Sequence, residues 1–381
     1  MSIRATSTDE LARQVEAKVE LPSGGAIVPV PEFAAASSTP CDSTDLLSWM
    51  GWMTAGPPTL AAEVLRSAGY WAWVRYRWAL EDAHEVVRPT AAARSIRQHT
   101  RSMFSEAVGV GTAGYVGCLR LAPSGSLAVV NLDDTIDPLL TSRVIRRRFG
   151  SGKRQPDYLI IGGLDRGRVE LLAIECKGTV KNERTAIGQL VAGVRQVLGV
   201  ESDLPMRRVV FATSLDLDEK EPAVRCHAIE VKAEDRFQGG LDIEVAREAV
   251  RDAALIRALR CAGRYDDAER TRQGYVADWF EPQETFRIAD RPMVGRGVEL
   301  LSVDAHLRAE VGVDLELLRA LAAPRSERQA LLEPLEGEIP DQERDRRIDS
   351  PERVQQETLM RDGLGIRFER RGRDSGEERF Q

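Results

Sequence analysis

Two apolar stretches joined by a turn constrain the fold of this chain more than any other feature. The segment from Pro156 to Gly178 reads PDYLIIGGLDRGRVELLAIECKG, and aliphatic residues dominate on both sides of LDRGR. Apolar runs of this kind, bounded by turn residues, predict a buried β-hairpin. The hairpin also carries Asp157 at one end and Glu175 and Lys177 at the other. Charged side chains at the ends of two apolar strands call for a reason other than packing.

The register of the hairpin brings the two acidic residues together. The turn is centred on Arg166, so Asp157 lies nine residues before the centre and Glu175 nine residues after it. A symmetric antiparallel register therefore predicts that the two carboxylates face each other. Side chains alternate along a strand, so Glu175 and Lys177 share one face and Cys176 points to the other.

Two directly opposed carboxylates repel each other, because the Cβ atoms of such a pair lie about 4.5–5.5 Å apart. One of the two would take up a proton unless a cation compensates the charge. Two carboxylates, a backbone carbonyl and water molecules form the hard oxygen site that suits Mg²⁺. The alternative is a half-exposed sheet whose charged ends are solvated and form weak surface ion pairs.

Lysine is rare in this chain, which gives Lys177 additional weight. Of the 53 basic residues only six are lysine, and three of these lie between residues 153 and 181. The six are Lys18, Lys153, Lys177, Lys181, Lys220 and Lys232. Lysine is a compact point charge with a tunable pKa, whereas arginine carries a wide planar head. We therefore expect Lys177 to have a chemical role beyond its positive charge.

Composition narrows the class of protein. A length of 381 residues allows two or three domains, and 43% hydrophobic and 30% charged residues are typical of a soluble protein. No apolar run approaches the ~18 residues of a membrane span, and the N-terminus lacks an apolar signal core. These features predict a cytoplasmic protein with no membrane partner. The five cysteines and four histidines are scattered, so neither a zinc site nor a disulfide framework is indicated.

The net charge of −7 argues against a protein that coats nucleic acid non-specifically. The charge is unevenly distributed, because residues 143–181 contain ten basic and four acidic residues. Basic residues that lead into Asp157 are candidate phosphate contacts, although a solvated loop would have the same composition. They are Arg146, Arg147, Arg148, Lys153 and Arg154.

Five regions follow from composition and hydrophobic periodicity. They are a flexible N-terminal segment and linker (1–43), a helical N-terminal region (44–89), a core (90–235), an α-rich C-terminal region (236–323) and a charged tail (324–381). The core should contain a helix at 90–109, strands at 114–121 and 126–132, the hairpin, a helix at 183–199, and strands at 207–215 and 226–231. This order predicts an α/β fold with a mixed β-sheet flanked by helices. The tail has few apolar side chains, which predicts disorder.

The aromatic-rich segment 70–78 contains five aromatic residues, Tyr70, Trp71, Trp73, Tyr76 and Trp78. Such side chains can stack on nucleobases. The alternative, which we favour on base rates, is a core helix or strand of the N-terminal region.

The charged hairpin end resembles the signature of a nuclease superfamily. Pro156-Asp157, seventeen intervening residues and then Glu175-Cys176-Lys177 is similar to the PD-(D/E)XK motif of restriction-endonuclease-like proteins. The order of elements, hairpin then helix then strand, also fits, and the resemblance covers about residues 90–232. It implies a restriction-endonuclease-like core with accessory regions, as in prokaryotic restriction or phage-defence effectors or in repair nucleases.

The resemblance also implies roles for particular residues. Asp157 and Glu175, joined by the backbone carbonyl of Cys176, would hold Mg²⁺, for which Mn²⁺ can substitute. Lys177 would orient the attacking water in phosphodiester hydrolysis, most often of DNA. Glu106 occupies the place of an acid on the preceding helix, and Gln189 that of a glutamine on the following helix. The aromatic residue that often follows this glutamine is replaced by Gly193. Double-strand cleavage would imply a homo-oligomer, and a defence role would imply partner proteins.

Two other classes of function compete with the nuclease. GVGTAG at 109–114 matches the GxGxxG fingerprint, and Asp133 and Asp134 follow at about the right spacing for a Rossmann-like dinucleotide-binding protein. The fingerprint requires a strand before it and a helix after it, and the sequence predicts the reverse order. The second competitor is a nuclease fold without catalysis that binds nucleic acid or serves as a scaffold.

Overall fold

The computed structural model shows two compact units, residues 1–253 and 254–381. The structure describes residues 1–33, 37–54, 71–122, 127–132, 139–140, 142, 144–148, 155–162, 169–217, 223–233, 243–261, 263–274, 285–288, 290–301, 305–332, 346–349, 353–359 and 364–372. Within these ranges no helix is both long and apolar enough to cross a membrane.

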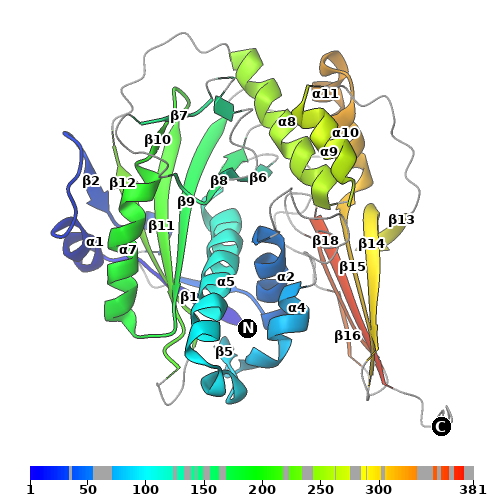
Figure 1. Cartoon of the computed structure of the whole chain (residues 1–381), viewed down its shortest axis with the longest axis horizontal. Helices are drawn as coiled ribbons and strands as arrows, with labels where there is room; N and C mark the ends of the chain where they lie inside the picture. Colours follow the sequence, from blue (N-terminus) through cyan, green and yellow to red (C-terminus); the bar gives the residue numbers. More distant parts are fainter. Residues whose placement is uncertain are drawn as a thin grey trace. The chain divides into compact units, whose positions relative to one another are not determined.

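An eight-stranded mixed sheet forms the centre of the first unit (Figure 1). Its strands lie in the order β3-β1-β12-β11-β9-β8-β6, and β2 pairs with β12 beside this path. The strands are β1 (Ser2–Thr6), β2 (Ala26–Val28), β3 (Ser37–Pro40), β6 (Leu127–Asn131), β8 (Tyr158–Gly162), β9 (Glu170–Thr179), β11 (Met206–Ser214) and β12 (Arg225–Lys232). The predicted α/β class, a mixed sheet flanked by helices, is confirmed.

A crossover helix connects two parallel strands at the centre of this sheet. β9 is followed by α7 (Glu183–Val197), and β9 then pairs in parallel with β11. Parallel neighbours need such a crossover, because a tight turn can join only antiparallel strands. Ala186, Leu190 and Val194 of α7 are buried in one cluster with Val210 and Ile229 of the sheet. The helix and the two strands predicted for this part of the core are confirmed.

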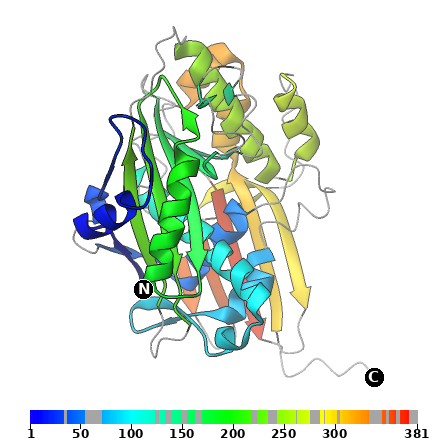
Figure 2. The same ribbon diagram turned by 60° about the vertical axis from the view of Figure 1, so that its left-hand side comes forward.

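Helices cover both faces of the sheet. α1 (Asp9–Glu16) lies beside α7 on one face, and its apolar residues join the same cluster (Figure 2). α5 (Gln98–Val116) packs on the opposite face, together with α2 (Ser43–Met53). A Cβ atom at Gly117, just after α5, would lie 2.7 Å from Ile174 Cδ1, so the helix end contacts the sheet directly.

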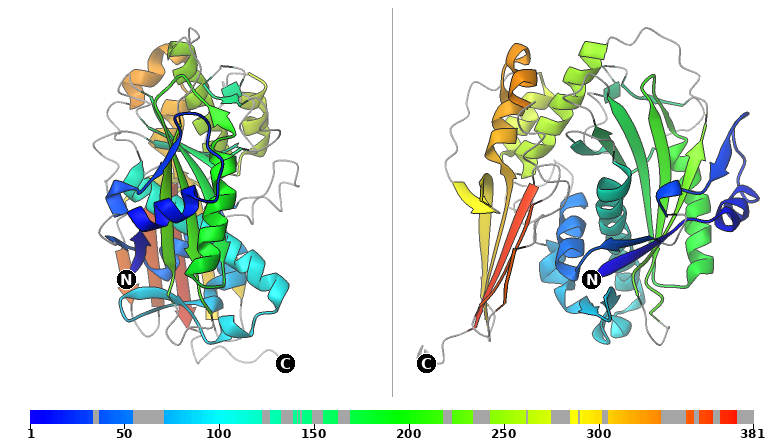
Figure 3. Two further views of the ribbon diagram at one scale, coloured as in Figure 1. Left: turned by 90° about the vertical axis from the view of Figure 1, so that its left-hand side faces the viewer. Right: turned by 180° about the vertical axis from the view of Figure 1, so that it is seen from behind.

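The expectation of a flexible segment over residues 1–43 is wrong. β1 pairs in parallel with β12, where Arg4 lies opposite Arg225, and β3 pairs antiparallel with β1. Figure 3 shows the N-terminal strands, in dark blue, against the green strands of the sheet. The strand SIRAT is short and half polar, and its partner is far away in the sequence. No local pattern therefore reveals the pairing.

The helical region expected over 44–89 is present in part. α2 is helical and α4 (Trp71–Tyr76) begins after the range 55–70, which lies outside the described residues. β4 (Leu80–Ala83) and β5 (Val86–Pro89) instead form a hairpin. The two positions at its turn, His84 and Glu85, have positive φ angles.

The glycine-rich stretch 109–114 lies inside α5, which contradicts its interpretation as a dinucleotide fingerprint. The strand predicted at 114–121 is also wrong, because α5 reaches Val116 and a π-helical turn continues to Leu121. The glycines allow close helix packing instead. A Cβ atom at Gly111 would lie 2.6 Å from Met50 Cγ of α2.

The second unit contains a six-stranded antiparallel sheet in the order β13-β14-β15-β18-β17-β16. Its strands are β13 (Thr285–Ile288), β14 (Arg291–Leu301), β15 (Ala305–Asp314), β16 (Arg346–Asp349), β17 (Arg353–Leu359) and β18 (Leu364–Gly372). The described residues of region 236–323 contain the helices α8 (Ile243–Cys261), which spans the boundary between units, α9 (Tyr265–Arg272) and α10 (Leu315–Ala322), and α11 (Arg325–Leu332) lies in the predicted tail. The region 236–323 is therefore α-rich only in part.

The expectation of a disordered tail over 324–381 is wrong for its described residues. β18 pairs with β15 on one side and with β17 on the other. Arg367 of this tail forms an ion pair with Glu310 on the neighbouring strand β15. Opposite charges on paired strands and the backbone ladder thus stabilise strands that are poor in apolar residues.

Candidate active site

Asp157 and Glu175 lie opposite each other at the end of the β8–β9 hairpin. Tyr158 pairs with Ile174, and the same register continued by one step sets Asp157 against Glu175. The backbone N–H of Asp157 donates a hydrogen bond to Glu175 Oε2 (3.2 Å). The backbone N–H of Cys176 donates one to Asp157 Oδ2 (2.9 Å). The register predicted from the sequence is confirmed, and each carboxylate is held by the backbone of the other strand.

Burial makes the charge of Glu175 unfavourable. Its side chain is 0% exposed. Burial, followed by the negative charge of Asp157, raises the pKa of Glu175 to about 8, although Lys177 acts in the opposite direction. A carboxyl with this pKa is largely protonated at neutral pH unless an additional positive charge approaches it.

Lys177 forms an ion pair with Glu175 Oε1. Burial alone would lower the pKa of Lys177, but the hydrogen bond and charge of Glu175, together with the charge of Asp157, raise it above the ordinary value. The ammonium group therefore stays protonated at neutral pH. Lys177 is the neighbour of Glu175 on the same face of β9, as the alternation of side chains predicts.

Gly193 on α7 makes room for Glu175. A Cβ atom at Gly193 would lie 2.4 Å from Val210 Cγ1 and 3.0 Å from Glu175 Cγ. The departure from the aromatic residue that the nuclease resemblance implies at this position thus has a steric reason. The Glu175 side chain extends toward α7, where a larger residue would displace it.

On the opposite face, α5 contacts the end of β9 through its backbone. A Cβ atom at Gly178 would lie 1.7 Å from the backbone oxygen of Ser105, and one at Gly109 would lie 2.6 Å from that of Lys177. Glycine at both positions lets the helix and the strand approach this closely. The contact places Glu106 beside the charged end of the hairpin.

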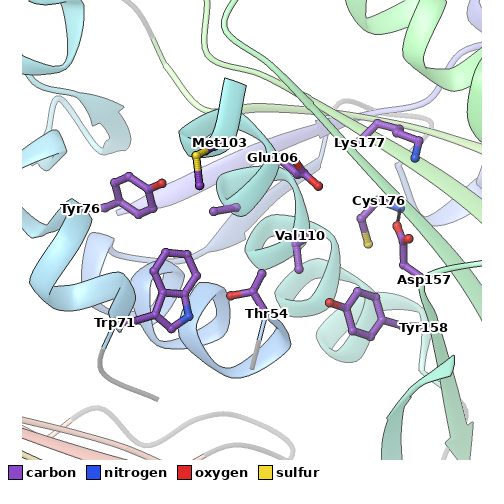
Figure 4. Close-up of a pocket in the computed structure, with 11 residues that line it drawn as sticks. Thr54, Trp71, Tyr76, Met103, Glu106, Val110, Asp157, Tyr158, Cys176 and Lys177 are labelled. Atoms are coloured by element: carbon purple, nitrogen blue, oxygen red, sulfur yellow. Dashed lines mark hydrogen bonds between the residues drawn. The ribbon is translucent and has the colours of Figure 1, made fainter. Parts of the chain in front are cut away.

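A cavity of about 330 Å³ lies on the α5 side of the hairpin end. Glu106, Asp157, Cys176 and Lys177 line one part of it. Figure 4 shows the Glu106 carboxylate directed from α5 toward the side on which the other three lie. Glu175 is not among its described lining residues. The structure therefore brings four of the predicted site residues to one cavity, whereas Glu175 is buried and extends toward α7.

The predicted site residue Gln189 lies on α7, half-buried and one turn before Gly193. It is not among the described residues that line the cavity. Gln196, also on α7, contacts the chain just before Asp157. Its Nε2 donates to the backbone oxygen of Gln155 at 3.5 Å, the outer limit of a hydrogen bond. Gln196 is thus a polar group of α7 near the hairpin end.

The basic residues before Asp157 are placed in part. Arg146 and Arg148 flank Glu201, each with a nitrogen 3.6 Å from one of its carboxylate oxygens. Arg147 is exposed and donates to Gln155 Oε1 at 3.5 Å. Lys153 and Arg154 lie outside the described residues. Of the three described arginines, Arg147 is exposed, whereas Arg146 and Arg148 are half-buried beside Glu201.

The donor chemistry at the hairpin end fits a divalent cation. Asp157 and Glu175 offer carboxylate oxygens, and the backbone carbonyl of Cys176 follows on the same strand, so every donor is a hard oxygen suited to Mg²⁺. Within the described part of the chain, no group of three or more His, Cys, Asp or Glu is placed to hold a metal ion. Mg²⁺ commonly needs only one or two carboxylates, with water and substrate phosphate completing its shell.

Sequence reasoning missed the remaining wall of the cavity. Trp71, Tyr76, Met103 and Tyr158 line it, and they come from three separate segments. The only sequence signal was the aromatic-rich segment 70–78, for which a core position was favoured. The favoured core interpretation holds for Tyr76, which is buried and also lines the cavity; the stacking of nucleobases stays a prediction.

Comparison of the chain with protein-family models, curated proteins and solved structures finds no match. The fold and the geometry of the hairpin end therefore carry the functional interpretation.

Proposed function

We propose that this chain is a Mg²⁺-dependent nuclease that hydrolyses phosphodiester bonds, most readily in DNA, at the Asp157–Glu175 end of the hairpin. One observation carries the proposal. Two carboxylates from adjacent strands face each other in the predicted register, with the ammonium of Lys177 against them. A structural role does not require two acids to be held together at the end of a hairpin, whereas a cation site does.

Each residue has a defined part in this proposal. Asp157, Glu175 and the Cys176 carbonyl would hold the cation, which would supply Lewis-acid chemistry at the phosphate. Lys177 stays protonated and contributes a point charge to stabilise the negative charge that develops on the phosphate. Glu106 faces the same cavity from α5 and is placed to accept a proton from, or hold, a water molecule.

A nuclease-like domain that binds without cleaving is the second candidate, and one observation favours it. Lys177 already pairs with Glu175, so one of the two carboxylates is compensated without a cation. Such a domain would bind DNA through exposed groups such as Arg147, and Mg²⁺ would change nothing. The two candidates therefore differ in their response to the metal.

The test is a cleavage assay with labelled single-stranded and double-stranded DNA, in Mg²⁺ and in EDTA. We expect cleavage in Mg²⁺ or Mn²⁺ and none in EDTA. Asp157→Asn should lose at least about 100-fold in rate, comparable to removing one preorganised electrostatic group from an active site. Glu170→Gln, at the other end of β9, is the matched control and should retain activity. Full activity of Asp157→Asn, or equal cleavage in EDTA, would refute the proposal.

A further inference from the structure

The metal site uses only one side of the cavity beside the hairpin. The other side is formed by apolar and aromatic residues, Trp71, Tyr76, Met103, Val110 and Tyr158. Hydrolysis at a phosphate has no use for these side chains. A cavity of about 330 Å³ is at the lower end of the range for small ligands, about 300–1,000 Å³. It suits a single planar group and not a duplex.

Tyr76 gives a second, independent indication of a ligand. Its side chain is 1% exposed, and among the described residues its hydroxyl has no hydrogen-bond partner. Figure 4 shows this hydroxyl directed into the cavity, toward Met103 and Glu106. A buried hydroxyl without a partner is unfavourable and is rare in folded proteins. A bound polar ring edge would supply the missing partner.

The ring of Tyr76 is fixed by its neighbours. It packs at 5.6 Å from the Trp71 ring and at 5.0 Å from the Phe104 ring, measured between centroids. These contacts hold the hydroxyl in place. Trp71 is only half-buried, so part of its ring remains available to a ligand.

The geometry points to a nucleobase as the ligand: we propose that this cavity binds one unpaired base of the nucleic-acid substrate, next to the phosphate at Asp157. The inference rests on the proposed function, because it takes the phosphate position from the metal site. A base offers a planar face to Trp71 and a polar edge to the Tyr76 hydroxyl and the Glu106 carboxylate. Base–aromatic stacking of this kind is tolerant of sequence.

The charges in the cavity exclude an anion from its aromatic end. Glu106 lines the cavity between the hairpin end and Tyr76, so a phosphate placed against the aromatic residues would meet its carboxylate. A neutral base with N–H donors avoids this repulsion, and its phosphate remains at Lys177. The substrate is therefore a single strand, or a duplex with an unpaired nucleotide, since a stacked and paired base cannot enter.

The test measures base insertion without cleavage, using the full chain in EDTA. The probes are a single-stranded oligonucleotide with 2-aminopurine in place of adenine, the same strand in a perfect duplex, and free 2-aminopurine deoxynucleoside monophosphate. We expect the fluorescence of the single strand to be quenched on binding. The duplex and the free nucleotide should be quenched much less at equal concentration.

Two variants test whether the base binds in this cavity, and a third serves as the control. Trp71→Leu should weaken binding of the single strand about 5-fold to 150-fold, and Trp78→Leu, an exposed tryptophan outside the cavity, should leave it unchanged. Tyr76→Phe keeps the ring and removes the hydroxyl, so it should weaken binding about 3-fold to 10-fold with no loss of folding. Tyr76→Phe therefore still tests the cavity if Trp71→Leu does not fold.

The inference is wrong if the single-stranded oligonucleotide does not bind, or binds without a loss of fluorescence. It is also wrong if the duplex or the free nucleotide is quenched as strongly as the single strand. The same holds if Tyr76→Phe quenches the single strand as strongly as wild type does. Failure of the proposed function is separable from these. Quenching in EDTA with no cleavage in Mg²⁺ would refute hydrolysis and leave the base site in place.

Discussion

The carboxylate of Glu175 accepts a hydrogen bond from the backbone N–H of Asp157 at 3.2 Å. The carboxylate of Asp157 in turn accepts one from the backbone N–H of Cys176 at 2.9 Å. Neither acid can therefore move without breaking a bond to the other strand. This mutual fixation preorganises both acids, which is what a metal-dependent active site requires of its ligands.

Lys177 should matter chemically and not only through its charge. Lys177→Arg keeps the charge, but the planar guanidinium cannot take the place of a compact ammonium against the buried Glu175. We expect Lys177→Arg and Lys177→Ala each to lose about 10²–10³-fold in cleavage rate while DNA binding persists. The matched control is Lys181→Arg, at an exposed position after β9, which should cleave like wild type. If Lys177→Arg cleaves at the wild-type rate, Lys177 acts only through its charge, and Asp157, Glu175 and Lys177 are simply the charged end of a hairpin.

The raised pKa of Glu175 should appear in the stability of the metal-free protein. The folded chain holds one more proton than the unfolded chain between the ordinary pKa of 4.5 and the folded value of about 8. This contribution to stability is fully present below pH 4.5 and is lost as the pH rises through 8. Glu175→Gln is neutral throughout, so its melting temperature in EDTA should fall less than that of wild type between pH 5 and pH 9. Parallel curves for the two proteins would show that Glu175 has no raised pKa.

Two glycines offer a matched pair for testing the contact between α5 and β9. Gly178→Ala would place a Cβ atom 1.7 Å from the Ser105 backbone oxygen, so the helix must shift. We expect a loss of about 1–3 kcal/mol in unfolding free energy, with reduced cleavage because Glu106 is displaced. Gly188→Ala on α7 meets nothing within 4 Å and should stabilise the protein by about 0.5–1 kcal/mol. Equal melting temperatures for the two variants would contradict this packing.

The last three strands should stabilise the second unit. Truncation after residue 345 removes β16, β17 and β18, and leaves β15 with an unpaired edge and Glu310 without Arg367. We expect faster hydrogen exchange at β15 amides and increased aggregation of the truncated chain. Unchanged exchange protection of β15 would show that the tail adds nothing to the sheet.

The hairpin and its register could be predicted from the sequence, because the information is local. Two aliphatic runs, one central turn and the alternation of side chains fix the pairing of Asp157 with Glu175. The helix 183–199 was equally clear from its apolar spacing. A local signal also made the lysine at 177 conspicuous.

Other features depend on contacts between distant segments. The pairing of β1 with β12 joins the two ends of the first unit, and the cross-strand charges of β15 and β18 become visible only once the strands are adjacent. The run 114–121 looked like a strand, but its buried residues lie on a continuation of α5. The residues that line the cavity come from α4, α5 and the hairpin, so no single stretch of sequence predicts it.

Metal binding tests the central claim most directly, since it requires no knowledge of the substrate. Mn²⁺ bound per chain can be measured by electron paramagnetic resonance at pH 8.5, where the carboxyl of Glu175 is mostly ionised. We expect wild type and the control Glu170→Gln to bind Mn²⁺ at one common site, and Asp157→Asn and Glu175→Gln to lose that binding. Equal Mn²⁺ binding by all four proteins, or none by wild type, would contradict a metal site at the Asp157–Glu175 pair.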